Sequence, residues 1–419
     1  MPEPEEYVTK AITLINSCIN TDARFHTKKV MDRLLTISAV GVLVKDLIAI
    51  VGPKRPDKVM TKLNELDRKI GELSNKMSIL FDDLKSFHVA HDFFARTSAS
   101  AGTLLRYMKN TISNPCADNM NLFRTECERT PPLRLAREFM ERLKVEETNP
   151  LKMAMNADKL KTRRTFQKWK NIIDGVLAQF LVLETYLNGM FWNRNMIGPN
   201  ELAGEIKEVS AQIDHWDRSY HRENRGWEGI QQLMVDTQDH NQHLGNWDKA
   251  DIIQIALDGI MTNDTFYVLV FDDKGGDENW AFEWQHDNQC FRSYSRGGCS
   301  VVVYRTTRWN DRKFYSNQVE EAMKKVNYPN RDAFFIGDRY QPVVTSLYHE
   351  LNKHCECGFV AMIRKRLNTA IRWVNCSPKD LPWGPGWWKH VKTPDLWQCL
   401  GLYAVPNNGD EFLVVVGFK

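Results

Sequence analysis

The chain has almost no excess of charge of either sign. Its 56 lysine and arginine residues nearly balance its 53 aspartate and glutamate residues, which leaves a formal net charge of +3 over 419 residues. A nucleic-acid groove normally carries a dense basic surface, so we do not expect nucleic acid as a partner. With 42% hydrophobic and 26% charged residues the composition is globular, and the length predicts two domains.

Catalytic signatures are missing as well. The chain has no Gly-x-Ser-x-Gly elbow and no phosphate-binding loop, and the glycine pairs at 275–276 and 297–298 suit turns between strands. The segment from His349 to His354 comes close to a zinc-protease helix, which needs two histidines four residues apart. Here the separation is five, which rotates the second imidazole by about 140° on an α-helix. We therefore predict no enzyme activity, no bound metal and no cofactor.

The cysteines are odd in number and scattered along the chain. Nine cysteines exclude a complete set of internal disulfides. Reduced thiols in the cytoplasm are the favoured interpretation, and a Cys290–Cys299 pair across a hairpin is the alternative in an oxidising compartment. The first residues, Met-Pro-Glu-Pro-Glu-Glu, lack the basic start and apolar run of a secretory signal. We therefore expect a cytoplasmic location if the chain is full length.

The most apolar stretch of the chain runs from Leu34 to Val51, with Lys45 and Asp46 inside it. Each large aliphatic residue favours membrane insertion by roughly 0.3–0.6 kcal/mol, and each charge opposes it by roughly 2.5–3.5 kcal/mol, so the two sums nearly cancel. The predicted resting state is a buried central helix, and conditional membrane insertion is the alternative. The insertion candidates are Leu34, Leu35, Val40, Val44, Leu47 and Val51, with Lys45 and Asp46 as a polar stripe.

Two other stretches carry matched apolar stripes in which the residues repeat at steps of three and four. This spacing predicts long helices of the coiled-coil type that pack antiparallel in an elongated bundle. Because Gly52-Pro53 ends the apolar helix, a tight reversal there would lay it against the first of these helices. The stripes are Leu63, Leu66, Ile70, Leu73, Met77, Leu80, Leu84 and Phe87, then Leu202, Ile206, Val209, Ile213, Trp216 and Tyr220.

The apolar period changes from helical to alternating near residue 262. We predict a helical bundle over residues 1–262 and a smaller mixed, mainly antiparallel β domain with two helices over 263–419, an α+β multidomain fold. Predicted bundle helices are 5–20, 27–51, 57–95, 99–113, 132–147, 160–192, 201–221, 227–238 and 248–262. Predicted strands are 265–271, 280–286, 300–306, 358–364, 369–375, 396–405 and 411–418, with helices at 316–326 and 341–354.

Tryptophan is concentrated toward the end of the chain. Trp383, Trp387, Trp388 and Trp397 lie around a segment rich in proline and glycine. Such rings suit recognition of a surface, such as a sugar, a lipid headgroup or a protein partner, because each offers a large apolar area and one donor. The competing interpretation is that the rings fill a small core beneath an irregular loop, since tryptophan is highly buried on average.

The order of these segments resembles a known family. A short polar start, a helix, the apolar stretch with its Gly-Pro end, and then Leu63-Asn-Glu-Leu-Asp-Arg-Lys-Ile-Gly-Glu-Leu are similar to the N-terminal half of the rapunzel and SE-cephalotoxin-like family. The likeness covers about residues 28 to 260. It implies a helical bundle akin to helical pore-forming toxins, followed by a β-rich domain. It also implies secretion, in contrast to the missing signal.

Two functions follow as hypotheses. In the first, the protein is non-enzymatic and toxin-like, its apolar helix is sheathed by the striped helices, and its C-terminal domain recognises a lipid membrane or a surface receptor. Membrane action would then require homo-oligomers that bury Lys45 and Asp46. In the second, it is a soluble cytosolic protein-interaction module with no membrane activity.

Overall fold

The computed structural model divides the chain into two compact units, which we call the helical unit and the sandwich unit. The helical unit comprises residues 1–158 and 164–218, and the sandwich unit comprises residues 159–163 and 219–419. The structure describes residues 4–19, 30–49, 57–82, 91–192, 195–223, 227–273, 279–306, 321–322, 325, 341–353, 357–376, 386–392 and 411–418.

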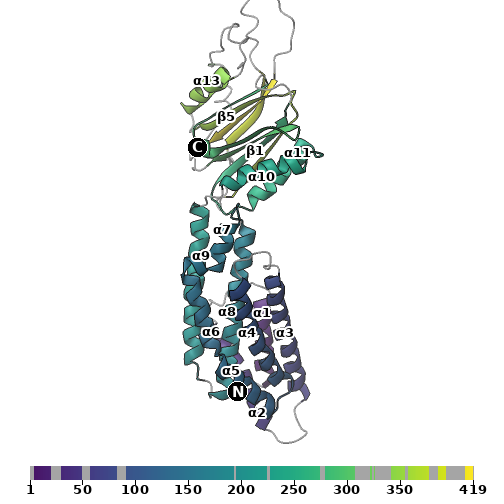
Figure 1. Ribbon diagram of the computed structural model, residues 1–419, viewed down its shortest axis with the longest axis vertical. Coiled ribbons are helices and arrows are strands. Elements are labelled where there is room, and N and C mark those ends of the chain that lie inside the picture. Colours follow the sequence, from purple (N-terminus) through teal and green to yellow (C-terminus); the bar gives the residue numbers. More distant parts are fainter. Residues whose placement is uncertain are drawn as a thin grey trace, which may run out of the picture. The chain divides into compact units, whose positions relative to one another are not determined.

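The helical unit is a bundle in which helices distant in sequence lie side by side (Figure 1). Helix α1 packs against α2 and α3, α3 against α4, and α4 against α5 and α6. The helices are α1 (Pro4–Ile19), α2 (Val30–Ala49), α3 (Asp57–Asp82), α4 (His91–Ser113), α5 (Ala117–Arg129), α6 (Pro132–Lys144), η1 (Glu146–Thr148), α7 (Pro150–Ala157), α8 (Arg163–Phe191) and α9 (Ile197–Glu223).

The two predicted stripes form the inner faces of α3 and α9. The described stripe residues of α3, from Leu63 to Met77, are buried, as are those of α9 from Leu202 to Trp216. The outer face of α3 carries ion pairs such as Lys62 with Glu65, so the helix is amphipathic as its spacing predicts. The predicted single helix over 57–95 is replaced by α3 and α4, and α4 continues through residues 96–98. Leu84 and Phe87 lie outside the described residues.

The sandwich unit consists of two four-stranded antiparallel sheets. Their strand orders are β3-β4-β1-β6 and β2-β5-β8-β7. The strands are β1 (Thr265–Asp272), β2 (Trp280–Trp284), β3 (Cys290–Arg296), β4 (Cys299–Thr306), β5 (Cys357–Arg364), β6 (Thr369–Asn375), β7 (Gly386–Lys392) and β8 (Glu411–Phe418), with η3 at Asp287–Gln289. The helices are α10 (Trp227–His240), α11 (Asn246–Asp258) and α13 (Gln341–Asn352).

The two sheets pack face to face, and helices cover both outer faces (Figure 1). Strand β1 is apolar along almost its whole length because both of its faces are buried. Tyr267, Leu269 and Phe271 face the other sheet, whereas Phe266 and Val268 face α10 and α11. Helix α13 packs over the outer face of the second sheet. The unit therefore has four layers: helices, sheet, sheet and helix.

This arrangement confirms the α+β multidomain fold and moves the predicted boundary. Helices α10 and α11 were expected in the bundle over residues 1–262, but they cover a sheet of the sandwich unit, so the two units are nearly equal in size. Their apolar sides, including Ile230 and Ile253, pack on the same core as β1. Helical period reveals that a helix has a buried face and does not reveal which core buries it.

Several shorter elements were not predicted. Helices α5 and α7 and strands β3 and β7 are absent from the expected set, because short polar segments carry a weak periodic signal. The predicted strand at 396–405 and most of the predicted helix at 316–326 lie outside the described residues. Cys290 and Cys299 are free thiols at opposite ends of the β3–β4 hairpin, so the alternative of a disulfide between them is wrong.

The two sheets are in contact where Tyr304 of β4 meets Gly417 of β8. A Cβ added at Gly417 would lie 2.3 Å from a ring carbon of Tyr304, and the Tyr304 hydroxyl donates to the carbonyl of Phe418 at 2.5 Å. We expect Gly417→Ala to lower the free energy of unfolding by about 1–3 kcal/mol, because the ring has no room to move. Thermal denaturation of the full chain measures this. Gly245→Ala, at an open position, should change the melting temperature far less.

Candidate functional site

The apolar helix predicted at 34–51 appears as α2, and most of its candidate insertion residues are buried. Leu34, Val40, Val44 and Leu47 are at most 3% exposed. Leu35 is 48% exposed and is therefore not part of the core. Val51 lies outside the described residues. Of the polar stripe, Lys45 is half-buried and Asp46 is exposed. None of the described helices is long and apolar enough to cross a membrane.

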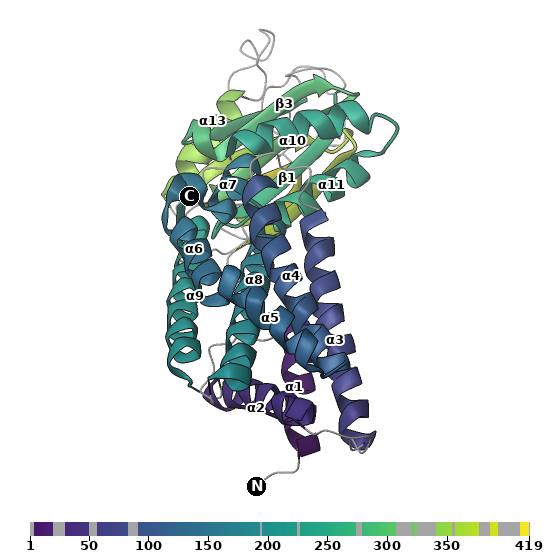
Figure 2. The same cartoon turned by 60° about the horizontal axis from the view of Figure 1, so that its bottom comes forward.

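Helix α2 lies across the end of α8, and the two backbones touch where they cross (Figure 2). A Cβ added at Gly41 would lie 2.5 Å from the carbonyl oxygen of Tyr186, and one added at Gly189 would lie 2.0 Å from that of Ser38. These distances leave no room for any side chain at either glycine. The expected packing of the apolar helix against α3 stays a prediction. Helix α2 packs on α1 and α8, while α3 packs on α1 and α4.

Helix α8 brings polar groups into the core of the helical unit. Glu184 and Asn188 are buried on successive turns, and the Asn188 side-chain amide donates to the Glu184 carboxylate at 2.8 Å. Burial raises the pKa of the Glu184 carboxyl, and this hydrogen bond partly opposes the rise. Tyr186 shares a hydrogen bond of 2.7 Å with Thr111 of α4. The core beneath α2 is thus apolar and contains these hydrogen-bonded polar groups, whereas the buried Ser38 hydroxyl of α2 has no hydrogen-bond partner among the described residues.

The outer face of α2 differs from that of the other long helices. Leu35 is exposed and Val42 and Leu43 are half-buried on the outer side of the helix, where the exposed Asp46 lies between them. On α3 the corresponding positions carry ion pairs such as Arg68 with Glu72. We call Leu35, Val42 and Leu43 of α2 the apolar strip. Apolar surface that remains uncovered on a folded protein is typical of a binding face.

The helical unit also has a groove of about 710 Å³ bounded by α6, α7 and α9. Its floor is apolar and includes Met140, Val209 and Trp216. The Lys152 ammonium lies 5.6 Å from the centroid of the Trp216 ring, and Arg137 pairs with Glu205 at 2.8 Å. The rim therefore carries both signs of charge, which gives the groove no preference for a charged ligand.

The four tryptophans predicted to recognise a surface are only partly described. Trp387 and Trp388 lie next to each other on β7, whereas Trp383 and Trp397 lie outside the described residues. Trp387 packs against the core beneath α13, and Trp388 is exposed with its ring edge-on to that of His390. Neighbouring residues of a strand point to opposite faces, so these two rings serve different roles.

A different aromatic surface appears on α11 and β6, which we call the tryptophan patch. Trp247 and Ile255 of α11 are exposed, Ile255 at 73%, whereas the exposed Trp373 of β6 lies on the opposite face of the sheet from α11. The Arg372 guanidinium stacks 4.5 Å from the centroid of the Trp247 ring and pairs with Asp251. Sequence reasoning missed this patch. Its only signal was the spacing of residues 247, 251 and 255, which share one helical face.

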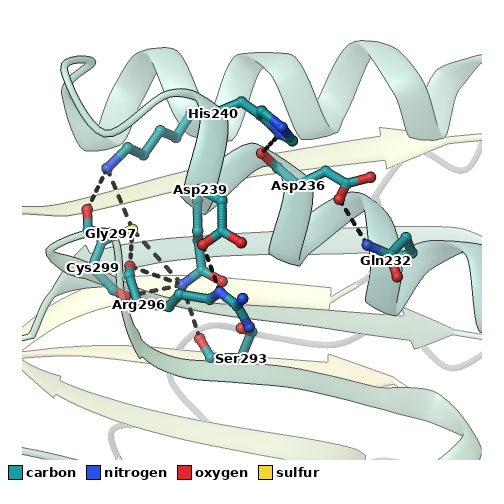
Figure 3. Close-up of polar contacts among 10 residues, drawn as sticks. Gln232, Asp236, Asp239, His240, Ser293, Arg296, Gly297 and Cys299 are labelled. Atoms are coloured by element: carbon teal, nitrogen blue, oxygen red, sulfur yellow. Dashed lines mark hydrogen bonds and ion pairs between the residues drawn. The ribbon is translucent and has the colours of Figure 1, made fainter.

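The most unusual polar cluster lies where α10 and α11 meet the turn of the β3–β4 hairpin (Figure 3). Lys249 is 2% exposed, and its ammonium donates to the carbonyl of Gly297 at 3.0 Å and lies 3.6 Å from the Cys299 sulfur. The Gln238 amide nitrogen lies within hydrogen-bond distance of the carbonyls of Ser293 and Cys299, at 3.2 and 2.9 Å. A buried ammonium normally has a carboxylate partner, and among the described residues Lys249 has none.

The backbone of this turn is unusual as well. Ser295, Gly297 and Gly298 have φ values of 54°, 55° and 76°. A Cβ added at Gly297 would lie 2.2 Å from the carbonyl oxygen of Gln238. Outside the cluster, Arg296 pairs with Asp239 at 2.6 Å, which ties the turn to α10 (Figure 3). The turn is therefore fixed by helix side chains on both of its sides.

The described residues contain no group of three or more histidine, cysteine, aspartate or glutamate side chains arranged to hold a metal ion. His349 is exposed on α13, and His354 and Cys355 lie outside the described residues. Neither nucleophile-base pairs nor oxyanion donors stand out among the polar contacts of the described chain.

Comparison with known proteins gives one match. Residues 61–395 match the family described as Protein of unknown function (DUF684). The chain belongs to this family. No curated protein matches the chain, and no solved structure does. The DUF684 match covers α3 through β7 and includes both the groove and the Lys249 cluster, whereas α1 and α2 precede it.

The acidic residue Asp174 of α8 makes the stability of this DUF684 member depend on pH. Burial raises the pKa of its carboxyl from an ordinary 3.8 to about 6; Lys170 opposes the rise and Asp214 adds to it. The folded protein therefore binds this proton more tightly than the unfolded chain. The stabilising contribution is full below pH 3.8 and is lost as the pH rises through about 6.

We expect Asp174→Asn to raise the free energy of unfolding at pH 8 by about 1–3 kcal/mol and to have little effect at pH 4. Denaturant unfolding followed by far-ultraviolet circular dichroism at both pH values measures the difference. Glu128→Gln, on the exposed surface of α5, is the control and should give the same small change at both. An equal effect of Asp174→Asn at pH 4 and pH 8 would contradict the assignment.

Proposed function

We propose that the protein is non-enzymatic and toxin-like in build, and that it binds membrane surfaces through α2. The observation that carries this proposal is the apolar strip, formed by Leu35, Val42 and Leu43 on the outer side of α2. An uncovered apolar face of a helix is stabilised when it lies at the boundary between lipid headgroups and acyl chains. The sandwich unit then serves to recognise the target surface, a lipid or a receptor.

Binding at the interface and insertion are two separate steps in this proposal. The first step needs only the apolar strip and leaves the contacts of α2 with α8 in place. The second step would have to break the backbone contact between Gly41 and Gly189 and bury Lys45 and Asp46 in an oligomer. The glycine crossing is accordingly the restraint that keeps the protein in its resting state. The resemblance to the rapunzel and SE-cephalotoxin-like family remains a prediction that accords with this mechanism.

Vesicle binding tests the first step. We expect the full chain to sediment with vesicles of phosphatidylcholine and phosphatidylserine, and the double variant Leu35→Glu and Val42→Glu to bind at least tenfold more weakly, because two charges then face the acyl chains. Ile79→Glu is the matched control, since Ile79 is 64% exposed on α3 and lies outside the apolar strip. If the wild-type chain fails to bind any such vesicle, or both variants weaken binding equally, the proposal is wrong.

Release of α2 tests the second step in the same assay. Gly41→Ala places a methyl group against a main-chain oxygen of α8, so we expect it to destabilise the helical unit by about 1–3 kcal/mol and to increase dye leakage from the vesicles. Gly204→Ala is the control, because its Cβ would meet nothing within 4 Å on α9 and a helical alanine is favourable by up to about 1 kcal/mol. Destabilisation without any leakage would restrict the protein to surface binding.

The second candidate is a protein-interaction module without membrane activity, and the tryptophan patch favours it. The patch combines the exposed apolar side chains of Trp247 and Ile255 with the stacked Arg372, a composition enriched in protein interfaces. A second copy of the chain is the partner tested here. If it docks on the patch, Ile255→Asp should abolish concentration-dependent self-association in sedimentation velocity and leave vesicle binding unchanged. A wild-type chain that stays monomeric at all concentrations removes self-association through the patch.

A further inference from the structure

Lys249 has an environment that a purely structural lysine does not need. Its ammonium is buried on α11 and contacts one carbonyl, that of Gly297, and one thiol, that of Cys299. Burying an ammonium without a carboxylate partner is unfavourable, because the charge loses its hydration and gains no opposite charge in return. An apolar side chain of similar length would avoid this cost. A structural role alone therefore does not explain why this buried position is a lysine.

The two reactive atoms are held toward each other by separate elements. Lys249 Nζ comes from α11, and Cys299 Sγ comes from the first residue of β4, 3.6 Å away and 50 residues along the chain. The hairpin turn that leads into β4 is fixed by the Gln238 amide and by its residues of positive φ. Neither atom can move far without disturbing these contacts. The pair is therefore positioned before any reaction occurs.

We propose that Lys249 and Cys299 form a covalent redox crosslink in which one oxygen atom bridges the lysine nitrogen and the cysteine sulfur. A bridging atom needs the nitrogen and sulfur close together, away from bulk water, and free of a competing carboxylate. All three conditions hold among the described residues. Cys290 and Cys376 are also buried thiols, but Cys376 contacts the carbonyl of Leu257, and among the described residues neither thiol is hydrogen-bonded to a lysine nitrogen.

A second observation points to the same place. The Gln238 side-chain oxygen is buried and has no hydrogen-bond partner, although its amide nitrogen lies near several acceptors. That nitrogen is also 3.9 Å from Cys299 Sγ. A bridging oxygen would give it a further acceptor, and the N–H that remains on Lys249 would be a donor available to the unpaired oxygen of Gln238. Oxidation would thus satisfy a group that the reduced state leaves unpaired.

The chemistry balances with a peroxide as the oxidant. One hydrogen peroxide oxidises the Cys299 thiol to the sulfenic acid, forming the S–O bond and releasing one water. A second peroxide accepts the two electrons that are lost as the N–O bond forms between Lys249 and this oxygen. That step starts from the ammonium and releases two waters and one proton. The product is the Lys–NH–O–S–Cys bridge, and a thiol reductant returns it to the free amine and thiol.

The crosslink would tie α11 covalently to β4. Helix α11 carries Trp247 and Ile255 of the tryptophan patch on its outer face and packs on β1 and β6 with its inner face. A covalent bond between a helix and the strand beneath it removes conformations from the unfolded chain and from partly opened states. We therefore expect oxidation to raise the melting temperature of the protein by several degrees.

Peptide mass mapping tests the crosslink directly. The full chain is treated with hydrogen peroxide, digested without reductant and analysed for a peptide that joins Lys249 to Cys299. The expected mass is the sum of the two peptides plus about 14 Da, for one oxygen gained and two hydrogens lost. Dithiothreitol should abolish the joined peptide and reverse the rise in melting temperature. Cys116, a half-buried thiol in the same digest, reports that peroxide has reacted.

Controls separate the crosslink from general oxidation. Cys299→Ser and Lys249→Arg should each lose the joined peptide and the rise in melting temperature, and Lys249→Arg retains the positive charge. In the wild-type digest, peptides that contain Cys290 or Cys376 should carry no lysine. The proposal is overturned if Cys116 is oxidised while Cys299 remains a thiol, or if Cys299 proceeds to sulfinic acid with no joined peptide.

Discussion

The helical unit depends on the crossing of two helix backbones. At Gly41 and Gly189 the main chains of α2 and α8 approach so closely that main-chain oxygens occupy the places of both Cβ atoms. This approach lets the apolar inner face of α2 settle on the buried end of α8, where a Glu184–Asn188 pair also has to be enclosed. The contact depends on the absence of side chains at both glycines. Any atom added there would therefore displace the two helices from each other.

The same crossing explains why one side of α2 stays uncovered. A helix that is held mainly by one side, through a narrow contact, keeps its other side free of packing. On α3 and α9 the free side carries charges, as expected for a helix that only contributes to a core. On α2 the free side carries Leu35, Val42 and Leu43, a pattern that a core helix alone does not require. Two effects oppose each other on α2: the apolar surface favours removal from water, and the charges of Lys45 and Asp46 favour contact with water.

The sandwich unit differs from the helical unit because its central strands are buried on both faces. Strands with long apolar runs, such as β1 and β8, were predicted since buried runs of β-branched residues leave a clear pattern. Strand β3 was missed because its sequence, Cys-Phe-Arg-Ser-Tyr-Ser-Arg, is largely polar and half-exposed at a sheet edge. The boundary near residue 262 was misplaced for a related reason. The apolar residues of α10 and α11 repeat with an ordinary helical period. The sheet that the two helices cover determines their position in the fold.

The amino-acid sequence alone determined which segments are helices and strands and which side of each is apolar, because period depends on residues close together in the chain. It also determined that the motifs of familiar active sites are missing. Only the tertiary structure decided that Gly41 meets Gly189, that α10 and α11 cover a sheet, and that Lys249 lies beside Cys299. These are contacts between residues far apart in sequence, and no local pattern encodes them, since they arise from how whole elements pack.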